Sequence, residues 1–244
     1  MLEIKDLSVS VEDKKIIDNF NLKINDGEIH VIMGPNGVGK SSICKVLFRD
    51  DDYKISNGTI KYNNIDLLKL DTSEVAKNGF YLVNQSPLAI EGITTSELLR
   101  TVLNEKNEHT DIFSFSKSLE KLCADLDIPS NYVHRDINVG MSGGEKKKIE
   151  LLHLWMIKPK FIILDEIDSG LDVDAINVVC DSINKYYQEY KPSILIITHH
   201  MNIIDHIEPN FVHVMMDGKI SKTGGKKLAQ EVLKSGFKKF KGQI

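Results

Sequence analysis

Residues 34–42 of the chain, GPNGVGKSS, have the types and spacing needed to bind phosphate. They match the pattern G-x-x-x-x-G-K-[ST], follow the apolar run IHVIM and open the helical pattern SSICKVLF. Glycines let successive backbone N–H groups converge on phosphate oxygens, and the N-terminus of the next helix adds a partial positive charge. A plain glycine turn is the alternative, but strand, loop and helix together favour a nucleotide-binding loop. Its predicted members are Gly34, Pro35, Asn36, Gly37, Val38, Gly39, Lys40, Ser41 and Ser42.

Two side chains of this loop and two acids far downstream could carry out phosphate chemistry. Lys40 is expected to reach the β- and γ-phosphates, and Ser41 to offer its hydroxyl to Mg²⁺. The apolar run FIIL leads into Asp165 and Glu166. We expect Asp165 to hold Mg²⁺ opposite Ser41, and Glu166 to polarise a water that attacks the γ-phosphate. A second acid at this point favours hydrolysis, whereas the alternative is a strand-end carboxylate pair with no role.

The elements that must position these residues form an alternating pattern. The first 35 residues predict strands and turns that end in the buried strand before the phosphate loop. From 86 to 158 helical patterns dominate and no strand stands out. Apolar runs then alternate with helices to the end, which indicates a mainly parallel sheet with crossovers. We therefore expect one α/β domain over residues 1–244, with a core of 1–85 and 159–244 and an inserted helical subdomain of 86–158.

A third motif, MSGGEKKK, begins another predicted helix at residues 141–148. Taken alone it is a helix cap, with Ser142 at the N-cap and Glu145 three residues later. Beside the phosphate loop and the acids, it makes the sequence resemble the ATP-binding-cassette (ABC) ATPases over nearly the whole chain. That resemblance implies ATP and Mg²⁺ as ligands, a P-loop core sheet with N-terminal antiparallel strands, and closure of two subunits over ATP. Ser142, Gly143, Gly144 and Glu145 are then predicted to contact the ATP bound by another copy.

Other residues match the same family in order. Gln85, after the strand-like YLV, is similar to the glutamine that senses Mg²⁺ and joins the core to the helical subdomain. His199, after ILIIT, is similar to the histidine that contacts the γ-phosphate, so the resemblance makes it catalytic with Glu166. Residues 169–172 resemble the loop that crosses the dimer interface, which places Asp172 there. A lone Gln or His is normally a polar residue without a catalytic role. Gln85 and His199 are assigned roles only because they occur in the order of the family's motifs and each follows a predicted strand.

One region departs from the family pattern. Many members carry an aromatic residue on which adenine stacks before the second strand, where this chain reads SVSVEDKK with Val11 as the nearest apolar residue. An aliphatic side chain gives less stacking energy than an aromatic ring. We therefore predict modest affinity for ATP and little preference for ATP over GTP.

Ile167 and Asp168 indicate which ABC ATPase the sequence resembles. Transporter ATPases usually have Pro-Thr here, whereas LDEIDSGLDVDA and SGGEKKK closely resemble the SufC family of the Suf iron–sulfur cluster assembly system. That resemblance implies a SufB/SufD-type scaffold as partner, docked through residues 86–99, and an ATP-dependent homodimer contact within the complex. The main alternative is a subunit of an ABC membrane transporter. A DNA-repair ATPase and a non-hydrolysing module fit less well, the first for lack of a coiled coil and the second because Glu166 and His199 occur together.

Bulk properties agree with an ordinary enzyme. The formal net charge of the 244 residues is −4, which gives no reason to expect nucleic acid or an acidic membrane surface as partner. Three scattered cysteines, Cys44, Cys123 and Cys180, have no zinc-ligand spacing and suit buried thiols in a reducing compartment. The longest apolar runs are strand-sized, so we expect no membrane insertion. The expected location is cytoplasmic, or a plastid if a transit segment was removed.

Overall fold

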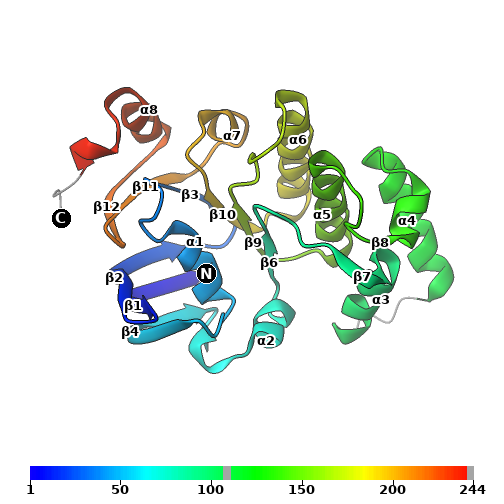
Figure 1. Ribbon diagram of the computed structural model, residues 1–244, viewed down its shortest axis with the longest axis horizontal. Helices are drawn as coiled ribbons and strands as arrows, with labels where there is room; N and C mark the ends of the chain where they lie inside the picture. The colour runs from blue at the N-terminus through cyan, green and yellow to red at the C-terminus, as the bar shows by residue number, and fades with distance from the viewer. Residues whose placement is uncertain (107–110, 241–244) are drawn as a thin grey trace.

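The larger sheet of the protein is built from apolar runs that the sequence separates widely. The structure is a computed structural model that describes residues 1–106 and 111–240. The strands of this sheet run in the order β12-β11-β3-β10-β9-β6 (Figure 1). Neighbours from β11 to β6 pair in parallel, and β12 pairs antiparallel with β11. The bounds are β3 (Ile29–Met33), β6 (Phe80–Val83), β9 (Phe161–Asp165), β10 (Ser193–Ile197), β11 (Phe211–Met216) and β12 (Lys219–Gly224).

Every residue of β3, β9 and β10 is buried, because both faces of this sheet are covered. Ile162, Leu164 and Ile196 point to one face and pack with α5 to α8. Phe161, Ile163 and Leu195 alternate with them and pack with α1, α2 and the N-terminal strands. The helix bounds are α1 (Lys40–Leu47), α2 (Thr72–Lys77), α5 (Gly143–Ile157), α6 (Val173–Tyr190), α7 (Met201–His206) and α8 (Lys226–Ser235).

The N-terminal part of the chain forms a second, antiparallel sheet, with the strand order β2-β1-β4-β5 (Figure 1). Its strands alternate buried and exposed residues, as expected for a sheet with one face on the core and one on solvent. The bounds are β1 (Leu2–Val11), β2 (Lys14–Ile24), β4 (Tyr53–Tyr62) and β5 (Ile65–Asp66). The parallel sheet with N-terminal antiparallel strands confirms the predicted fold class.

Helices α3 (Thr95–Glu105), α4 (Ile112–Asp125) and α5 gather on the side away from the antiparallel sheet (Figure 1). They share an apolar cluster of their own, which includes Leu99, Leu119 and Leu152. The sequence showed no strand here, but β7 (Ile90–Thr94) pairs with β8 (Asp136–Ile137). The alternation of apolar and polar residues that usually marks a strand is absent from β7. None of the β7 residues is buried. The division of the chain at 86 and 158 stays a prediction.

Short 3₁₀ turns complete the described elements, and they are η1 (Leu67–Lys69), η2 (Ser130–His134) and η3 (Phe237–Phe240). Within residues 1–106 and 111–240, no helix has both the length and the apolar character that crossing a bilayer requires.

Candidate functional site

The predicted site residues follow the carboxyl ends of the parallel strands. Gly34 comes after β3, Gln85 after β6 and His199 after β10, while Asp165 is the last residue of β9. Strands β6, β9, β10 and β3 are neighbours in that order, so four distant segments meet at one edge of the sheet. In open α/β sheets this edge is where ligands bind.

The backbone of the phosphate loop requires glycine at two positions. Gly39 is the N-cap of α1 and has φ 104°, a left-handed conformation that costs a larger residue energy. At Gly34 a Cβ atom would lie 2.5 Å from the carbonyl oxygen of Met215 in β11, which is closer than atoms can approach. The side chain of Ile16, in β2, also lies against Gly39, with its Cγ2 3.3 Å from where a Cβ would stand. The loop is therefore held between α1, β2 and β11.

Lys40 lies folded over this loop. Its Nζ donates to the carbonyl oxygens of Gly34 and Pro35, each at 3.0 Å, and lies 4.0 Å from Oε1 of Glu166. Burial lowers the pKa of Lys40, and the nearby carboxylates of Glu166 and Asp165 oppose that shift. The ammonium group thus faces the space that the glycine-rich backbone surrounds, with an acid on its other side.

Ser41 and Asp165, both expected to hold Mg²⁺, are in contact. The Ser41 hydroxyl donates to Oδ1 of Asp165 at 3.1 Å. Burial raises the pKa of Asp165, while the hydrogen bond from Ser41 opposes the rise. A hydroxyl beside a carboxylate is a hard-oxygen donor pair of the kind that Mg²⁺ prefers, so these residues fit the ion that the family implies.

Glu166 lies at the centre of several polar contacts. Its backbone has φ 45°, which is uncommon for a residue other than glycine, and its N–H donates to the carbonyl of Ile197 at 2.9 Å. Gln85 Nε2 donates to Oε2 at 3.0 Å, and His199 Nδ1 lies 3.6 Å from Oε1. Gln85 also lies 3.4 Å from the hydroxyl of Ser169. The acid expected to act as a base is therefore contacted by Gln85, which follows β6, by His199, which follows β10, and by Ile197 at the end of β10.

The serine-glycine-glycine segment lies apart from the phosphate loop of its own chain. Ser142 and Glu145 form a capping box on α5, and Tyr132 donates to Glu145 at 2.6 Å. These hydrogen bonds, led by that from Tyr132, lower the pKa of Glu145 to about 2. A Cβ on Gly143 would lie 3.7 Å from the carbonyl of Gly170. Among the residues that the structure describes, no hydrogen bond or ion pair joins 142–145 to 34–42.

Asp172 has a local role in this structure. Its side chain accepts a hydrogen bond from the N–H of Ala175 at 2.8 Å and so caps α6. The contact to a second copy that the resemblance implied for Asp172 stays a prediction.

Sequence reasoning missed an ion pair next to the site. Lys147 and Glu150, on α5, are buried and lie 2.9 Å apart. Lys147 also donates to the carbonyl of Asn84, and Glu150 accepts from the Asn84 N–H at 3.2 Å. The pair thus holds the residue just before Gln85 against α5. Two opposite charges three residues apart on a helix look like a solvated pair in sequence, so no local signal marked them.

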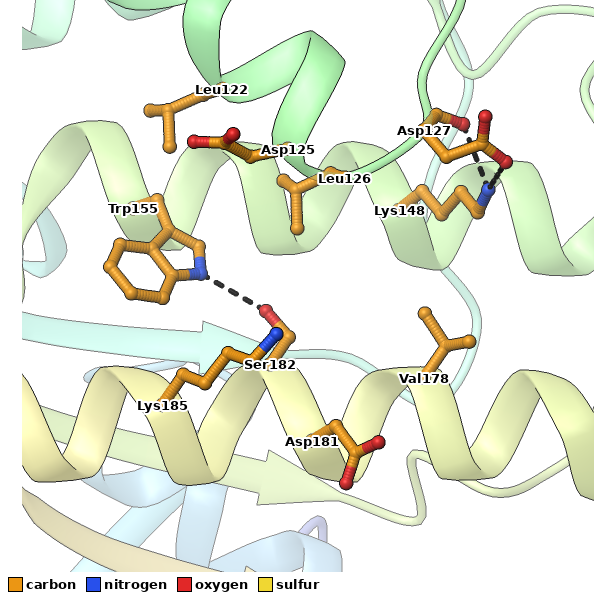
Figure 2. A pocket seen from close by; sticks show the side chains of 10 residues that line it. All are labelled: Leu122, Asp125, Leu126, Asp127, Lys148, Trp155, Val178, Asp181, Ser182 and Lys185. Atoms are coloured by element: carbon orange, nitrogen blue, oxygen red, sulfur yellow. Dashed lines mark hydrogen bonds and ion pairs between the residues drawn. The ribbon is translucent and has the colours of Figure 1, made fainter.

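A cavity of about 510 Å³ lies between α4, α5 and α6 (Figure 2). Trp155 and Ser182 meet across it, with the indole N–H donating to the hydroxyl at 3.0 Å, and Lys148 pairs with Asp127 at its edge. None of its lining residues belongs to the predicted ATP site. The cavity therefore gives no support to the nucleotide assignment.

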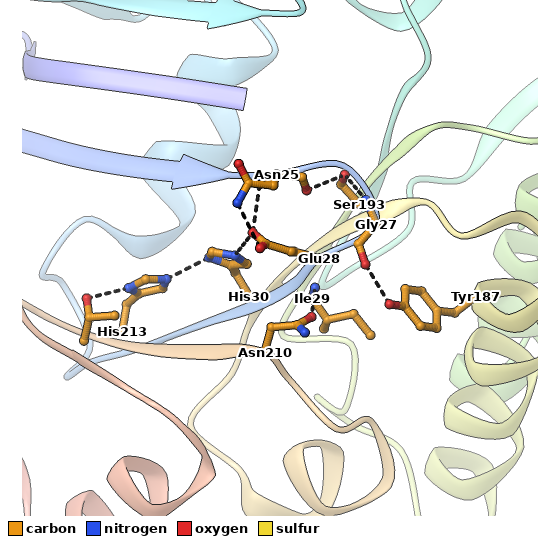
Figure 3. Close-up of polar contacts among 10 residues, drawn as sticks. Asn25, Gly27, Glu28, Ile29, His30, Tyr187, Ser193, Asn210 and His213 are labelled. Atoms are coloured by element: carbon orange, nitrogen blue, oxygen red, sulfur yellow. Dashed lines mark hydrogen bonds and ion pairs between the residues drawn. The ribbon is translucent and has the colours of Figure 1, made fainter. Parts of the chain in front are cut away.

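A polar network around two buried histidines joins β3, β11 and β12 (Figure 3). His30 Nδ1 lies 2.9 Å from Nε2 of His213, and its Nε2 lies 3.0 Å from a carboxylate oxygen of Glu28. His213 Nδ1 in turn lies 2.8 Å from the hydroxyl of Thr223. Burial lowers the pKa of His30 and lowers that of His213 to about 3. None of these residues belongs to the predicted nucleotide site.

Comparison with known proteins agrees with the geometry. The model of the family described as ABC transporter matches residues 17–169. An Escherichia coli (strain K12) protein named "Probable ATP-dependent transporter SufC" is 40% identical, with 97% of each chain covered. "Vegetative protein 296" of Bacillus subtilis (strain 168) is 41% identical, over 100% of this chain and 94% of that one. A dimeric ATP-binding cassette bound to ADP and Pi superposes with a TM-score of 0.79 at 21% identity, covering 93% of this chain and 99% of that one.

A cassette fold with these motifs at the strand ends defines the class of ABC ATPases, enzymes that hydrolyse ATP to ADP and phosphate. Within that class the chain belongs to the SufC family, as its identity over nearly full length with the relatives above shows. The resemblance stated from the sequence is thereby confirmed, as is the expected ATPase activity. The roles of individual residues stay predictions.

Proposed function

We propose that this ATPase drives conformational change in a SufB/SufD-type scaffold on which iron–sulfur clusters are assembled. The observation that supports this best is the 40% identity, over 97% of the chain, to a protein named SufC. Ile167 and Asp168, which replace the Pro-Thr usual in transporter ATPases, support the same reading.

The phosphate loop and its neighbours account for nucleotide binding in this proposal. The backbone of 34–42 and the Lys40 ammonium would hold the phosphates, and Ser41, Asp165 and Gln85 would hold Mg²⁺. When bound, the ion supplies positive charge that offsets the negative charge on the phosphate oxygens. The Lys40 ammonium donates to the carbonyl oxygens of Gly34 and Pro35, and phosphate oxygens of ATP would compete for the same donors.

Glu166 is proposed to act as general base. Its carboxylate takes a proton from water as the water oxygen attacks the γ-phosphorus, and the bond to the β–γ bridging oxygen breaks, which releases ADP and phosphate. His199 is proposed to donate to a γ-phosphate oxygen, and its position 3.6 Å from Glu166 supports a role beside that acid. Gln85 orients the other oxygen of the same carboxylate.

Two copies are proposed to close over ATP. The N-terminus of α5, with the Ser142 hydroxyl and the backbone of Gly143 and Gly144, offers donors that suit a γ-phosphate bound by the second copy. Residues 142–145 make no polar contact with their own phosphate loop in the described structure, which is consistent with a role between copies. ATP favours closure only because it binds the closed dimer better than the open state.

The scaffold is proposed to dock on residues 86–99. Leu88, Ile90 and Ile93 expose 74%, 41% and 43% of their surface in this segment. Asn138 donates to the carbonyl of Leu88 at 2.8 Å and Gly92 donates to Asp136 at 3.0 Å, so the apolar side chains are presented on an ordered surface. Because the segment starts one residue after Gln85, movement there reaches the predicted Mg²⁺ and base contacts directly.

Co-purification from the native host tests the proposal. We expect two scaffold proteins of the SufB/SufD type to accompany the wild-type chain, and Leu88→Ser with Ile93→Ser to abolish their binding while the chain's own ATPase activity remains. Leu233→Ser, which alters a residue 53% exposed on α8, is the matched control and should retain both partners. Recovery of a polytopic membrane protein in place of the scaffold would contradict the proposal.

A transporter subunit is the second candidate function. It is favoured by the names of several relatives, which include "Probable ATP-dependent transporter ycf16" of Cyanophora paradoxa at 38% identity. The two candidates share their chemistry and differ in partner, so the same co-purification decides between them.

A further inference from the structure

Asp168 lies in the turn that follows the proposed base. Its neighbour Ile167 is 1% exposed and packs in the core beneath the sheet, which anchors the turn. The Asp168 carboxylate is itself buried, with 4% of the side chain exposed, and its Oδ2 lies 3.6 Å from Nε2 of His200. Within the residues that the structure describes, its Oδ1 has no hydrogen-bond partner. A carboxylate removed from water is costly, and the His200 imidazole is the ring that faces its other oxygen.

His200 belongs to the loop that carries His199. The two imidazole rings lie 4.0 Å apart, and His199 reaches Glu166 at 3.6 Å. The backbone N–H of His200 donates to the hydroxyl of Thr198, a residue that is completely buried. The loops after β9 and β10 are therefore joined by two acid–histidine contacts side by side, Glu166 with His199 and Asp168 with His200.

Of these two contacts, only Asp168–His200 lacks a residue with a proposed role in the reaction. His200 has 55% of its side chain exposed, so without an anchor it is free to turn into solvent. Glu166 has the strained φ of 45°, a conformation that persists only where its surroundings hold it. The Asp168–His200 contact joins the loop after β9 to the loop after β10 and so can hold both in place.

We propose that Asp168 is a positioning residue for ATP hydrolysis, which acts by holding His200 and thereby keeps His199 in place against Glu166. The inference rests on the proposed roles of Glu166 and His199, and not on the identity of the scaffold. Among the described residues, neither Asp168 nor His200 makes a hydrogen bond or ion pair with the phosphate loop. Loss of the Asp168 carboxylate should therefore slow turnover without weakening nucleotide binding, since small displacements of reacting groups lower the rate of the chemical step.

A double-mutant cycle on the full-length chain tests this, with steady-state ATPase rates at saturating Mg²⁺. We expect Asp168→Asn and His200→Ala each to lower kcat about tenfold and to change KM less than about twofold. Because both act through one contact, the double variant should also lose about tenfold and not about a hundredfold. Asp174→Asn, an exposed acid in the first turn of α6, is the control and should keep the wild-type kcat.

Additive losses, or a His200→Ala variant with wild-type kcat, would overturn the inference. If Asp168→Asn does not fold, His200→Ala alone decides, because that side chain is largely exposed. Glu166→Gln is measured in parallel: if it retains turnover, the proposed role of the base fails, whereas an inactive Glu166→Gln beside a normal His200→Ala removes only the role of Asp168.

Discussion

The hydroxyl of Ser41 lies 3.1 Å from Oδ1 of Asp165, although 124 residues separate the two in the sequence. The contact arises because β3 and β9 both pair with β10 in parallel and so end at the same edge of the sheet. One strand leads into the phosphate loop and the other ends on the acid. This pair is the geometric core of the proposed nucleotide site.

Asp165→Asn should lower ATPase activity by at least about 100-fold, because the amide supplies no charge for Mg²⁺. The loss should be specific to the metal, so that nucleotide binding in EDTA matches that of the wild type. Titration of a fluorescent nucleotide with and without Mg²⁺ measures both. Asp181→Asn, on the exposed side of α6, should leave both quantities unchanged, and wild-type Mg²⁺ dependence in Asp165→Asn would contradict the assignment.

Glu166→Gln should reduce turnover by about 100-fold or more, because the amide cannot accept the proton of the attacking water. ATP binding should persist, since Lys40 and the loop backbone remain. The variant should therefore accumulate as an ATP-bound dimer, which light scattering after size-exclusion chromatography detects. Normal turnover, or a monomer that ATP leaves unchanged, would count against the base and the dimer respectively.

The strands and the phosphate loop were predictable because their signals are local. Ile162 to Leu164 are continuous apolar residues, and the loop is a short motif in a fixed context. Lys147 with Glu150 was not predictable, since only the packing of α5 against the segment after β6 buries them. Asp168 differs from the Pro-Thr pattern of transporter ATPases, but its partner His200 was not predictable, because the contact depends on β9 and β10 being neighbours.

The loss of one partner of the Lys147–Glu150 pair should cost more stability than the replacement of both partners by apolar residues. Glu150→Met leaves the Lys147 ammonium buried without its carboxylate, at a cost of about 3 kcal/mol in the free energy of unfolding. Burial raises the pKa of Glu150, with Lys147 opposing the rise, which is consistent with the acid depending on its partner. Urea denaturation monitored by circular dichroism measures the loss.

Two variants sharpen that measurement. Replacing both residues by Met should recover part of the loss, since no unpaired charge is then buried. The recovery should be incomplete, because the N–H and carbonyl of Asn84 lose the side chains that they bind in the wild type. Asp127→Asn removes the exposed partner of Lys148 on the same helix and should leave the urea midpoint almost unchanged. Equal losses from Glu150→Met and the double variant would show that the contacts to Asn84 and the packing, and not the unpaired charge of Lys147, account for the loss.

ATP and GTP should bind with dissociation constants within about threefold of each other, because no aromatic ring is predicted to stack on the base. Val11 ends β1, and the aliphatic residue that lies against the phosphate loop is Ile16. Isothermal titration with both nucleotides measures the ratio. Strong selectivity for ATP would show that another group contacts the adenine base. Tyr53, the cross-strand neighbour of Val11, would be the first residue to replace.

Buried histidines should make the protein less stable in acid. Burial lowers the pKa of His153 to about 4, so the unfolded chain, with its ordinary value near 6.5, binds a proton that the folded chain does not. This stability is fully present above pH 6.5 and is lost as the pH falls below it, by roughly 2 kcal/mol at pH 5. The same sign holds for His213, whose pKa is about 3.

His153→Met isolates one of these contributions. Comparison of the two proteins at pH 8, where His153 is neutral in both folded and unfolded states, measures any change in packing. Between pH 7 and pH 5 the variant should lose less stability than the wild type, by roughly 2 kcal/mol, because one proton uptake on unfolding has been removed. Urea denaturation at each pH gives the slopes, and parallel slopes for the two proteins would show that His153 does not titrate in this way.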